Sequence, residues 1–145
     1  MILNKKIEEF LRLNLYNSCL ESFGIKKQFI ELELSNSRFE EIKFFIDCKI
    51  NTLDLESEKI ISILKGLDKD TFEIIYFLKA NLKHIVDCSF DSDDNFRVNF
   101  ENNYVIIFNL NCSDDANLSI TFREKENSDT YSAIEIQGDG ILTMN

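Results

Sequence analysis

The segment Asp91-Ser92-Asp93-Asp94-Asn95 carries the residue types that bind hard cations. Oxygen side chains at its first, third and fifth positions match the opening of a calcium-binding EF-hand loop. The rest of that pattern is missing, because the sixth position is Phe96 where a sharp turn needs glycine, and the twelfth is Asn102 where a bidentate glutamate is needed. The flanking residues alternate as strands do. We therefore expect no calcium site in this segment.

The sequence also lacks the residues that other kinds of catalytic site or metal site need. His84 is the only histidine, and the chain has neither a nucleophile elbow nor a glycine-rich phosphate or oxyanion loop. The cysteines are far apart and form no C-x-x-C pair, so they do not match a zinc site, and we expect reduced thiols. They are Cys19, Cys48, Cys88 and Cys112. The sequence therefore predicts no enzyme, no cofactor and no metal.

The net charge of the chain is −10, and it is concentrated in the C-terminal part. Residues 1–84 hold 14 acidic and 13 basic side chains, whereas residues 85–145 hold 12 acidic and 3 basic ones. Such a chain is repelled by phosphate backbones and anionic lipid, so direct nucleic-acid and membrane binding are not expected. Acidic loops keep a sheet soluble, and they also form recognition surfaces for basic partners.

The elements that must position these acids follow from the hydrophobic periodicity. Apolar residues at three- and four-residue spacing predict a helix over residues 4–23, with Gly24 ending it. Alternation then predicts a β-hairpin with strands at 30–34 and 42–50. Helical spacing returns after Asp54 and predicts two short helices. Five alternating segments follow, at about 85–90, 95–101, 104–111, 118–123 and 131–136. The expected fold is a single α+β domain over residues 1–145 that ends in an antiparallel β-meander of about five strands.

A meander brings alternate connections to the same end of the sheet, so it predicts where the acids gather. Same-end connections lie about 10 Å apart, which is comparable to the Debye length of about 8 Å, and their fields overlap. We expect one end to be the partner-binding site, formed by Asp91, Asp93, Asp94, Asp114, Asp115 and Asp139. We expect the other end to carry Glu101, Glu124, Glu126 and Asp129.

Four apolar residues lie at positions where the pattern leaves their burial open. Phe39 falls between the two hairpin strands, and Phe45 falls on the polar side of the second one. Val105 and Ile107 occupy the second face of a meander strand. Either helices cover these residues or they add apolar contacts to a protein-binding patch.

Together these patterns predict a cytoplasmic protein-binding inhibitor. Its size and acidity are typical of bacterial immunity proteins and antitoxins, which would neutralise a basic, nuclease-like toxin by blocking its active cleft. A phage-type inhibitor that mimics the charge of DNA would have the same charge pattern. An acidic secretion chaperone is a further alternative, although such chaperones end in a helix, and an enzyme that uses scattered carboxylates is the least favoured.

Overall fold

A computed structural model describes residues 2–26, 29–64, 74–111, 113, 115–127, 129, 131–138 and 142–144. Its helices are α1 (Ile2–Leu15), α2 (Leu55–Leu64) and α4 (Ile74–Ala80), with a 3₁₀ turn at Glu101–Asn103. Its first strands are β1 (Cys19–Lys26), β2 (Phe29–Ser35), β3 (Phe39–Asp47), β4 (Lys49–Thr52) and β5 (Ile85–Phe90). The others are β6 (Phe96–Phe100), β7 (Tyr104–Asn109), β8 (Asn117–Glu124), β9 (Tyr131–Gln137) and β10 (Leu142–Met144). The α+β class, with antiparallel sheets, is confirmed.

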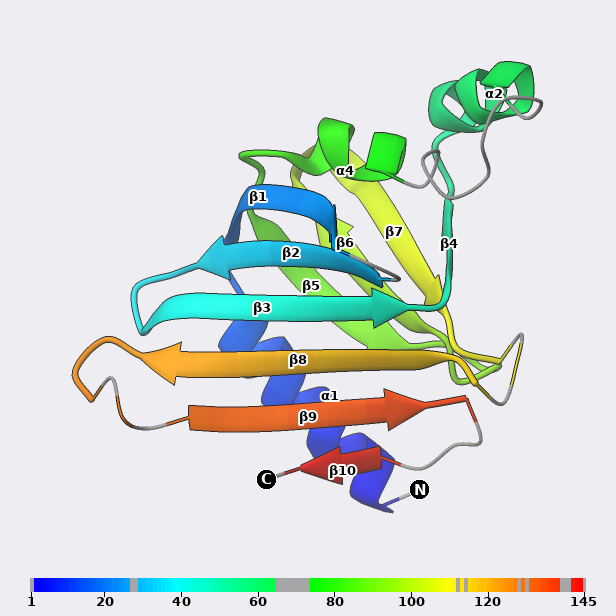
Figure 1. Cartoon of the computed structure of the whole chain (residues 1–145). Coiled ribbons are helices and arrows are strands. Elements are labelled where there is room, and N and C mark those ends of the chain that lie inside the picture. The colour runs from blue at the N-terminus through cyan, green and yellow to red at the C-terminus, as the bar shows by residue number, and fades with distance from the viewer. Residues whose placement is uncertain are drawn as a thin grey trace.

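The strands form two antiparallel sheets, not one meander (Figure 1). One sheet has the order β1-β2-β3-β8-β9-β10, and the other has the order β4-β7-β6-β5. The five expected C-terminal strands are therefore divided, with β5 to β7 in the smaller sheet and β8 and β9 in the larger one. The predicted single meander is wrong because the chain crosses from one sheet to the other between β7 and β8, where β8 pairs with β3.

The N-terminal helix is shorter than expected. It ends at Leu15, and Asn17 adopts the left-handed conformation with φ of 62°. Residues 19–26 form the edge strand β1, which pairs with β2, so Gly24 lies inside a strand and ends no helix. The sequence predicts a longer helix because Cys19 lies four residues after Leu15, which fits helical spacing. A strand that enters the same core also satisfies this spacing.

The second hairpin strand divides at Cys48. Its first part, β3, pairs with β2 and β8, whereas its second part, β4, pairs with β7 of the other sheet. Ile46 and Ile50 are both buried, so the alternation of apolar residues continues through the corner. A periodicity of two residues reports which side chains are buried but not which sheet they belong to.

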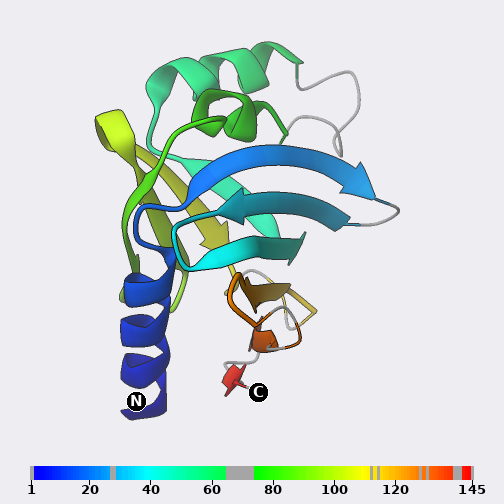
Figure 2. The same ribbon diagram turned by 90° about the vertical axis from the view of Figure 1, so that its left-hand side faces the viewer.

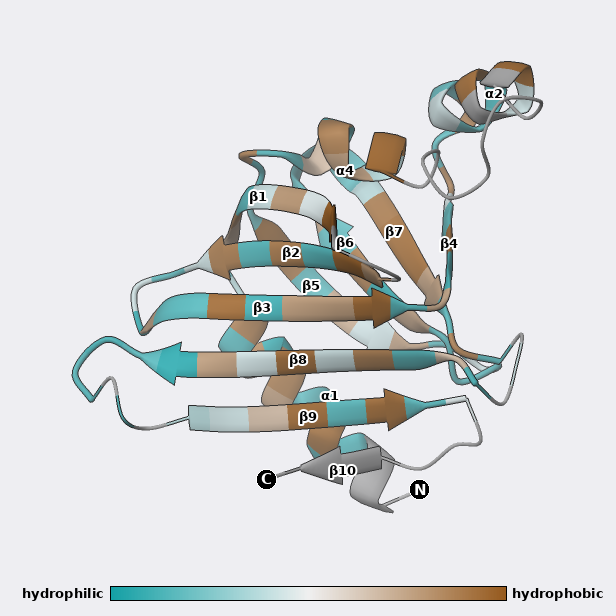
Figure 3. Ribbon diagram, viewed as in Figure 1, coloured by the Kyte–Doolittle hydropathy of each residue, from teal (hydrophilic) through white to brown (hydrophobic). Residues whose placement is uncertain are grey.

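The core lies between the larger sheet and a layer made by the smaller sheet and α1. Along the strands, apolar and polar residues alternate (Figure 3). Figure 2 shows α1 beside the lower part of the larger sheet, below the smaller sheet. Ring contacts join the layers: Phe44 meets Phe108 at 5.9 Å, and Phe122 meets Phe10 of α1 at 5.6 Å between ring centroids. Among the described residues, no helix has both the length and the apolar character needed to cross a bilayer.

Asp54 begins α2 as its N-cap. Its Oδ2 atom accepts hydrogen bonds from the backbone N–H of Ser57 at 3.1 Å and from Ser57 Oγ at 2.7 Å. Lys79 of α4 donates to the same oxygen at 2.8 Å, so this carboxylate joins α2 to α4. The hydrogen bond from Lys79, with those from Ser57, lowers the pKa of Asp54 from 3.8 to about 2.

The Asp54→Asn variant tests this joint through its pH dependence. Asparagine still caps the helix but cannot form the ion pair with Lys79. Because the pKa of Asp54 is lowered in the folded state, its charged form stabilises the fold above pH 3.8, and this contribution is lost as the pH falls toward about 2. We expect the variant to be less stable than the native chain at pH 6, with the difference shrinking between pH 5 and 2.5 in urea titrations. A difference that does not change with pH would contradict the ion pair.

Candidate functional site

Two loops that carry predicted aspartates lie at one end of the molecule. Asp91, Asp93 and Asp94 occupy the turn between β5 and β6, and Asp115 lies on the connection from β7 to β8. Because Phe96 at the start of β6 pairs with Phe108 near the end of β7, both connections leave the smaller sheet at the same end. Figure 1 shows these loops near the end of β3 and the beginning of β8. Asp114 and Asp139 lie outside the described residues.

Asp91 shapes the turn that exposes its neighbours. Its Oδ1 atom accepts hydrogen bonds from the backbone N–H groups of Asp93 at 2.9 Å and Asn95 at 3.0 Å. Asp94 adopts a left-handed conformation with φ of 62°, which aspartate tolerates better than most residues. The carboxylates of Asp93 and Asp94 are left exposed to solvent. Asp91 therefore forms the turn, and the charges free to meet a partner are those of Asp93 and Asp94.

Hydrogen bonds from one side chain and from the backbone fix the two loops and the end of β9 against one another. Asn95 Oδ1 accepts hydrogen bonds from the N–H groups of Leu110 at 3.0 Å and Asn111 at 3.3 Å. Gly138, directly after β9, donates to Ala116 O at 2.7 Å. A Cβ atom at Gly138 would lie 1.9 Å from Ser113 O, so only glycine permits this approach. We call the set Asp91, Asp93, Asp94 and Asp115 the acidic end.

Two further charged residues lie at this end. Asp47 ends β3 opposite Asn117, and Lys49 begins β4 opposite Asn109. Both side chains are exposed. The sequence does not point to Asp47, because the alternation of apolar residues predicts one continuous strand over residues 42–50 and so places residue 47 in its middle.

The acids expected at the opposite end do not form one group. Glu124 ends β8 and pairs with Arg38 at 3.1 Å, and Glu126 and Asp129 follow it in the connection to β9. Glu101 instead follows β6 in the smaller sheet, where its Oε1 atom lies 2.5 Å from His84 Nδ1. The single-meander assumption caused this error, because β6 and β8 belong to different sheets.

The structure also brings a cysteine beside the only histidine. Cys19 and His84 are directly opposite each other in an antiparallel bridge, and Glu101 contacts His84. A thiol, an imidazole and a carboxylate in this order could serve as nucleophile, base and orienting acid. The charges around the thiol oppose that chemistry. Partial burial, together with the carboxylates of Glu21 and Glu101, raises the pKa of the Cys19 thiol. A thiol whose pKa is raised is a poor nucleophile.

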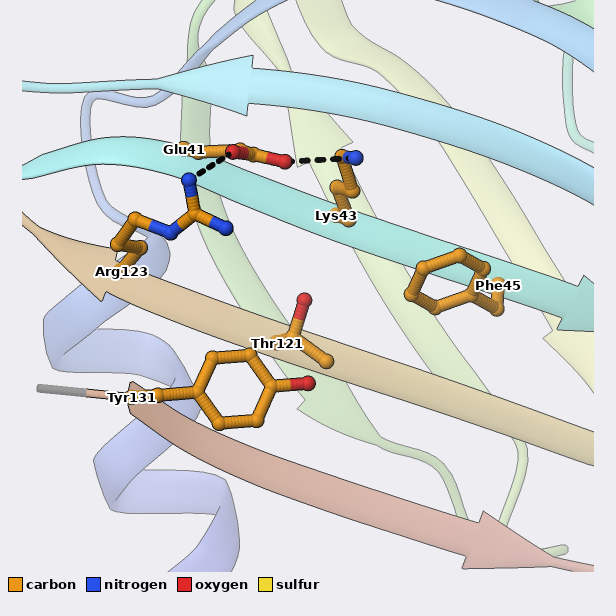
Figure 4. Close-up of a pocket in the computed structure, with 6 residues that line it drawn as sticks. All are labelled: Glu41, Lys43, Phe45, Thr121, Arg123 and Tyr131. Atoms are coloured by element: carbon orange, nitrogen blue, oxygen red, sulfur yellow. Dashed lines mark ion pairs between the residues drawn. The ribbon is translucent and has the colours of Figure 1, made fainter. Parts of the chain in front are cut away.

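The outer face of the larger sheet holds an ion-pair network and a small hollow (Figure 4). Lys43 Nζ lies 2.7 Å from Glu41 Oε1, and it is also within 4 Å of Glu31 and Glu33. Arg123 approaches the other Glu41 oxygen at 3.1 Å, and the two cations lower the pKa of Glu41. The hollow has a volume of about 150 Å³ and is lined by Glu41, Lys43, Phe45, Thr121, Arg123 and Tyr131. Its cations already have partners, so it offers no unpaired charge to a ligand.

No protein-family model, curated protein or solved structure shows a significant match to this chain. Within the part of the chain that the structure describes, no three His, Cys, Asp or Glu side chains lie close enough to hold a metal ion.

The four apolar residues whose burial the sequence pattern leaves open fall into two groups, one buried and one half-buried. Phe39 is buried and its ring lies 5.0 Å from that of Phe122, so it belongs to the core. Phe45 is half-buried on the outer face of the larger sheet, where its ring lies 5.7 Å from that of Phe29. Val105 and Ile107 are half-buried on the outer side of the smaller sheet. None of these four residues is among the large apolar side chains that are clearly exposed.

Proposed function

We propose that this chain is a protein-binding inhibitor of the immunity or antitoxin type, which binds a basic, nuclease-like toxin in the cytoplasm and blocks its active cleft. The observation that carries this proposal is the acidic end. Two loops place aspartates on one rigid end, and the carboxylates of Asp93, Asp94 and Asp115 are exposed there. A toxin that cleaves nucleic acid needs a positively charged cleft, which such an end complements.

The acidic end acts through the rate of association. Exposed aspartates gain little from single ion pairs in water, but their summed field attracts an oppositely charged surface. Complementary charge raises association rates and makes them depend on salt. The proposed inhibitor therefore forms its complex quickly and works by occlusion of the cleft, not by catalysis.

The test begins with the partner and ends with its association kinetics. The immobilised chain is expected to capture a basic protein at low salt from its own cells. Asp93→Asn, Asp94→Asn and Asp115→Asn in one variant should then slow association roughly three- to tenfold and flatten its salt dependence, measured by stopped-flow fluorescence. Asp91 is left unchanged because its carboxylate forms the turn.

The matched control removes three charges elsewhere. Glu40→Gln, Glu126→Gln and Asp129→Asn change the net charge by the same amount at exposed positions. They lie at the start of β3 and in the connection from β8 to β9, away from the acidic end. Equal slowing in both variants would show that only the total charge matters. A captured partner that is acidic, or association independent of salt, would contradict the proposed function.

A further inference from the structure

A shallow apolar groove lies between α1 and the edge strand β5, apart from the acidic end. It has a volume of about 470 Å³ and is lined by Glu9, Arg12, Leu13, Tyr16, Val86 and Asp87. Its apolar side chains are well exposed, at 74% for Leu13, 62% for Tyr16 and 46% for Val86. Grouped exposed apolar side chains with a charged rim are typical of protein-binding sites.

The core does not require these apolar residues. Helix α1 buries Ile7, Leu11 and Leu15, which form its core-facing stripe. Leu13 lies on a different side of the helix, where polar residues are usual, and Tyr16 directly follows the end of the helix. Val86 is at an irregularity in the pairing of β5 with β6, which turns it outward. The helix and the strand therefore each add apolar surface that the fold itself does not bury.

The edge of β5 is closed to a partner strand. Ile85 exchanges backbone hydrogen bonds with Asn17 and Ser18, each at 2.8 Å. Arg12 Nε donates to Cys88 O at 3.2 Å, and Glu8 Oε2 accepts from the N–H of Phe90 at 2.8 Å. These contacts occupy the backbone groups along the edge of β5 with which an added strand would have to pair. A ligand in the groove must therefore be recognised through side chains, as a helix in a groove is.

The charge of the groove selects the kind of helix. Arg12 is already paired, with Asp87 at 2.9 Å and with Glu8 at 3.5 Å. Glu9 adds another carboxylate to the rim, so acids outnumber the single guanidinium. An apolar helix face flanked by lysine or arginine complements both the floor and the rim.

The groove and the acidic end lie along one strand. Val86 lies near the start of β5, and Asp91 directly follows the end of that strand, five residues later, which corresponds to about 17 Å. A standard interface covers about 800 Å² on each partner and is roughly 30 Å across, so one partner can reach both.

We propose that the groove between α1 and β5 seats the apolar face of a basic amphipathic helix of the partner. This inference rests on the proposed function. It assigns different steps of partner binding to the two surfaces. The acidic end attracts the partner and sets the association rate, whereas the groove holds an apolar anchor and sets the dissociation rate.

The test uses a defined probe. A fluorescent 14-residue helical peptide of leucine and lysine, with its leucines on one face, is titrated against the full chain by anisotropy. A second peptide has glutamate in place of every lysine. We expect the Leu13→Ser, Tyr16→Ser double variant to weaken binding of the lysine peptide by at least about tenfold. Leu55→Ser, which removes a leucine 78% exposed on α2, should change it less than about twofold.

Nuclear magnetic resonance supplies the location. The lysine peptide should shift the amide signals of residues 9–16 and of Val86 and Asp87. Equal weakening by both serine variants, shifts confined to other residues, no binding, or equal binding of the glutamate peptide would overturn the proposal. The proposal would also be overturned if the native chain formed a dimer that the double variant converts to a monomer, because the groove would then hold a second copy.

The two proposals can fail separately. With the captured basic partner, the double variant should raise the dissociation rate and leave the association rate nearly unchanged. If the aspartate variant slows association while the double variant leaves dissociation unchanged, the groove assignment is wrong and the acidic-end function stands. If the lysine peptide occupies the groove but the aspartate variant associates at the native rate, the acidic-end function is wrong.

Discussion

The Phe122→Ala variant is expected to lose about 3–5 kcal/mol of its free energy of unfolding. Phe122 is 1% exposed on β8, and its ring meets that of Phe10 at 5.6 Å and that of Phe39 at 5.0 Å. It therefore joins α1 to β3 and β8. Alanine leaves a cavity that these elements cannot close, because both sheet strands are fixed by backbone pairing.

A urea titration followed by circular dichroism measures this loss. The matched control is Phe45→Ala, which removes the same ring from the half-buried outer face of the same sheet. We expect the control to lose less than half as much, because its ring is partly in water before the substitution. Similar losses at the two positions would show that the ring cluster at Phe122 does not organise the core.

The strands of this protein could be predicted well because burial and alternation coincide. In β6, the buried residues Phe96, Val98 and Phe100 alternate with half-buried polar ones, as the period of two requires. Membership of a sheet could not be predicted in the same way. Each sheet buries one face against the same core, so β7 and β8 both have buried apolar residues at alternate positions, although they lie in different sheets. Only the long-range pairing of β3 with β8 separates them.

The acidic end could be located in part despite that error. The turn after β5 and the connection after β7 share an end because β6 lies between β5 and β7 in one antiparallel sheet, as it would in a meander. Glu101 and Glu124 were grouped wrongly because their strands do not share a sheet.

The groove was missed for a different reason. Helical periodicity singles out the residues that enter the core, and Leu13 and Tyr16 do not belong to that stripe. Two such residues three positions apart are themselves a signal, since exposed apolar side chains that lie together are typical of binding surfaces. Val86, on the edge strand that completes the groove, lies 70 residues after Tyr16 in the chain. No local sequence pattern could therefore place this strand beside the helix.

The Asn36→Ala variant is expected to lose about 2–3 kcal/mol, although Asn36 lies in a turn. Its Nδ2 group donates to Asn14 O at 2.9 Å and to Ser18 Oγ at 3.0 Å. Its Oδ1 atom accepts from the N–H groups of Arg38 and Phe39, each at 2.9 Å. One side chain thus holds the turn between β2 and β3 against the end of α1. Alanine would leave these groups without partners, and Ser18 is fully buried.

The comparison for Asn36→Ala is Ser37→Ala, which changes the next, exposed residue of the same turn. We expect this control to change stability by less than about 0.5 kcal/mol. Hydrogen exchange gives a local measurement, because the amide of Phe39 should exchange faster in Asn36→Ala at a pH where the fold is intact. If that amide stays protected and the two variants are equally stable, the Asn36 side chain does not join the helix to the hairpin. If it loses protection and the variant is also less stable than the control, the Asn36 side chain joins the turn to the end of α1, which forms one wall of the groove beside β5.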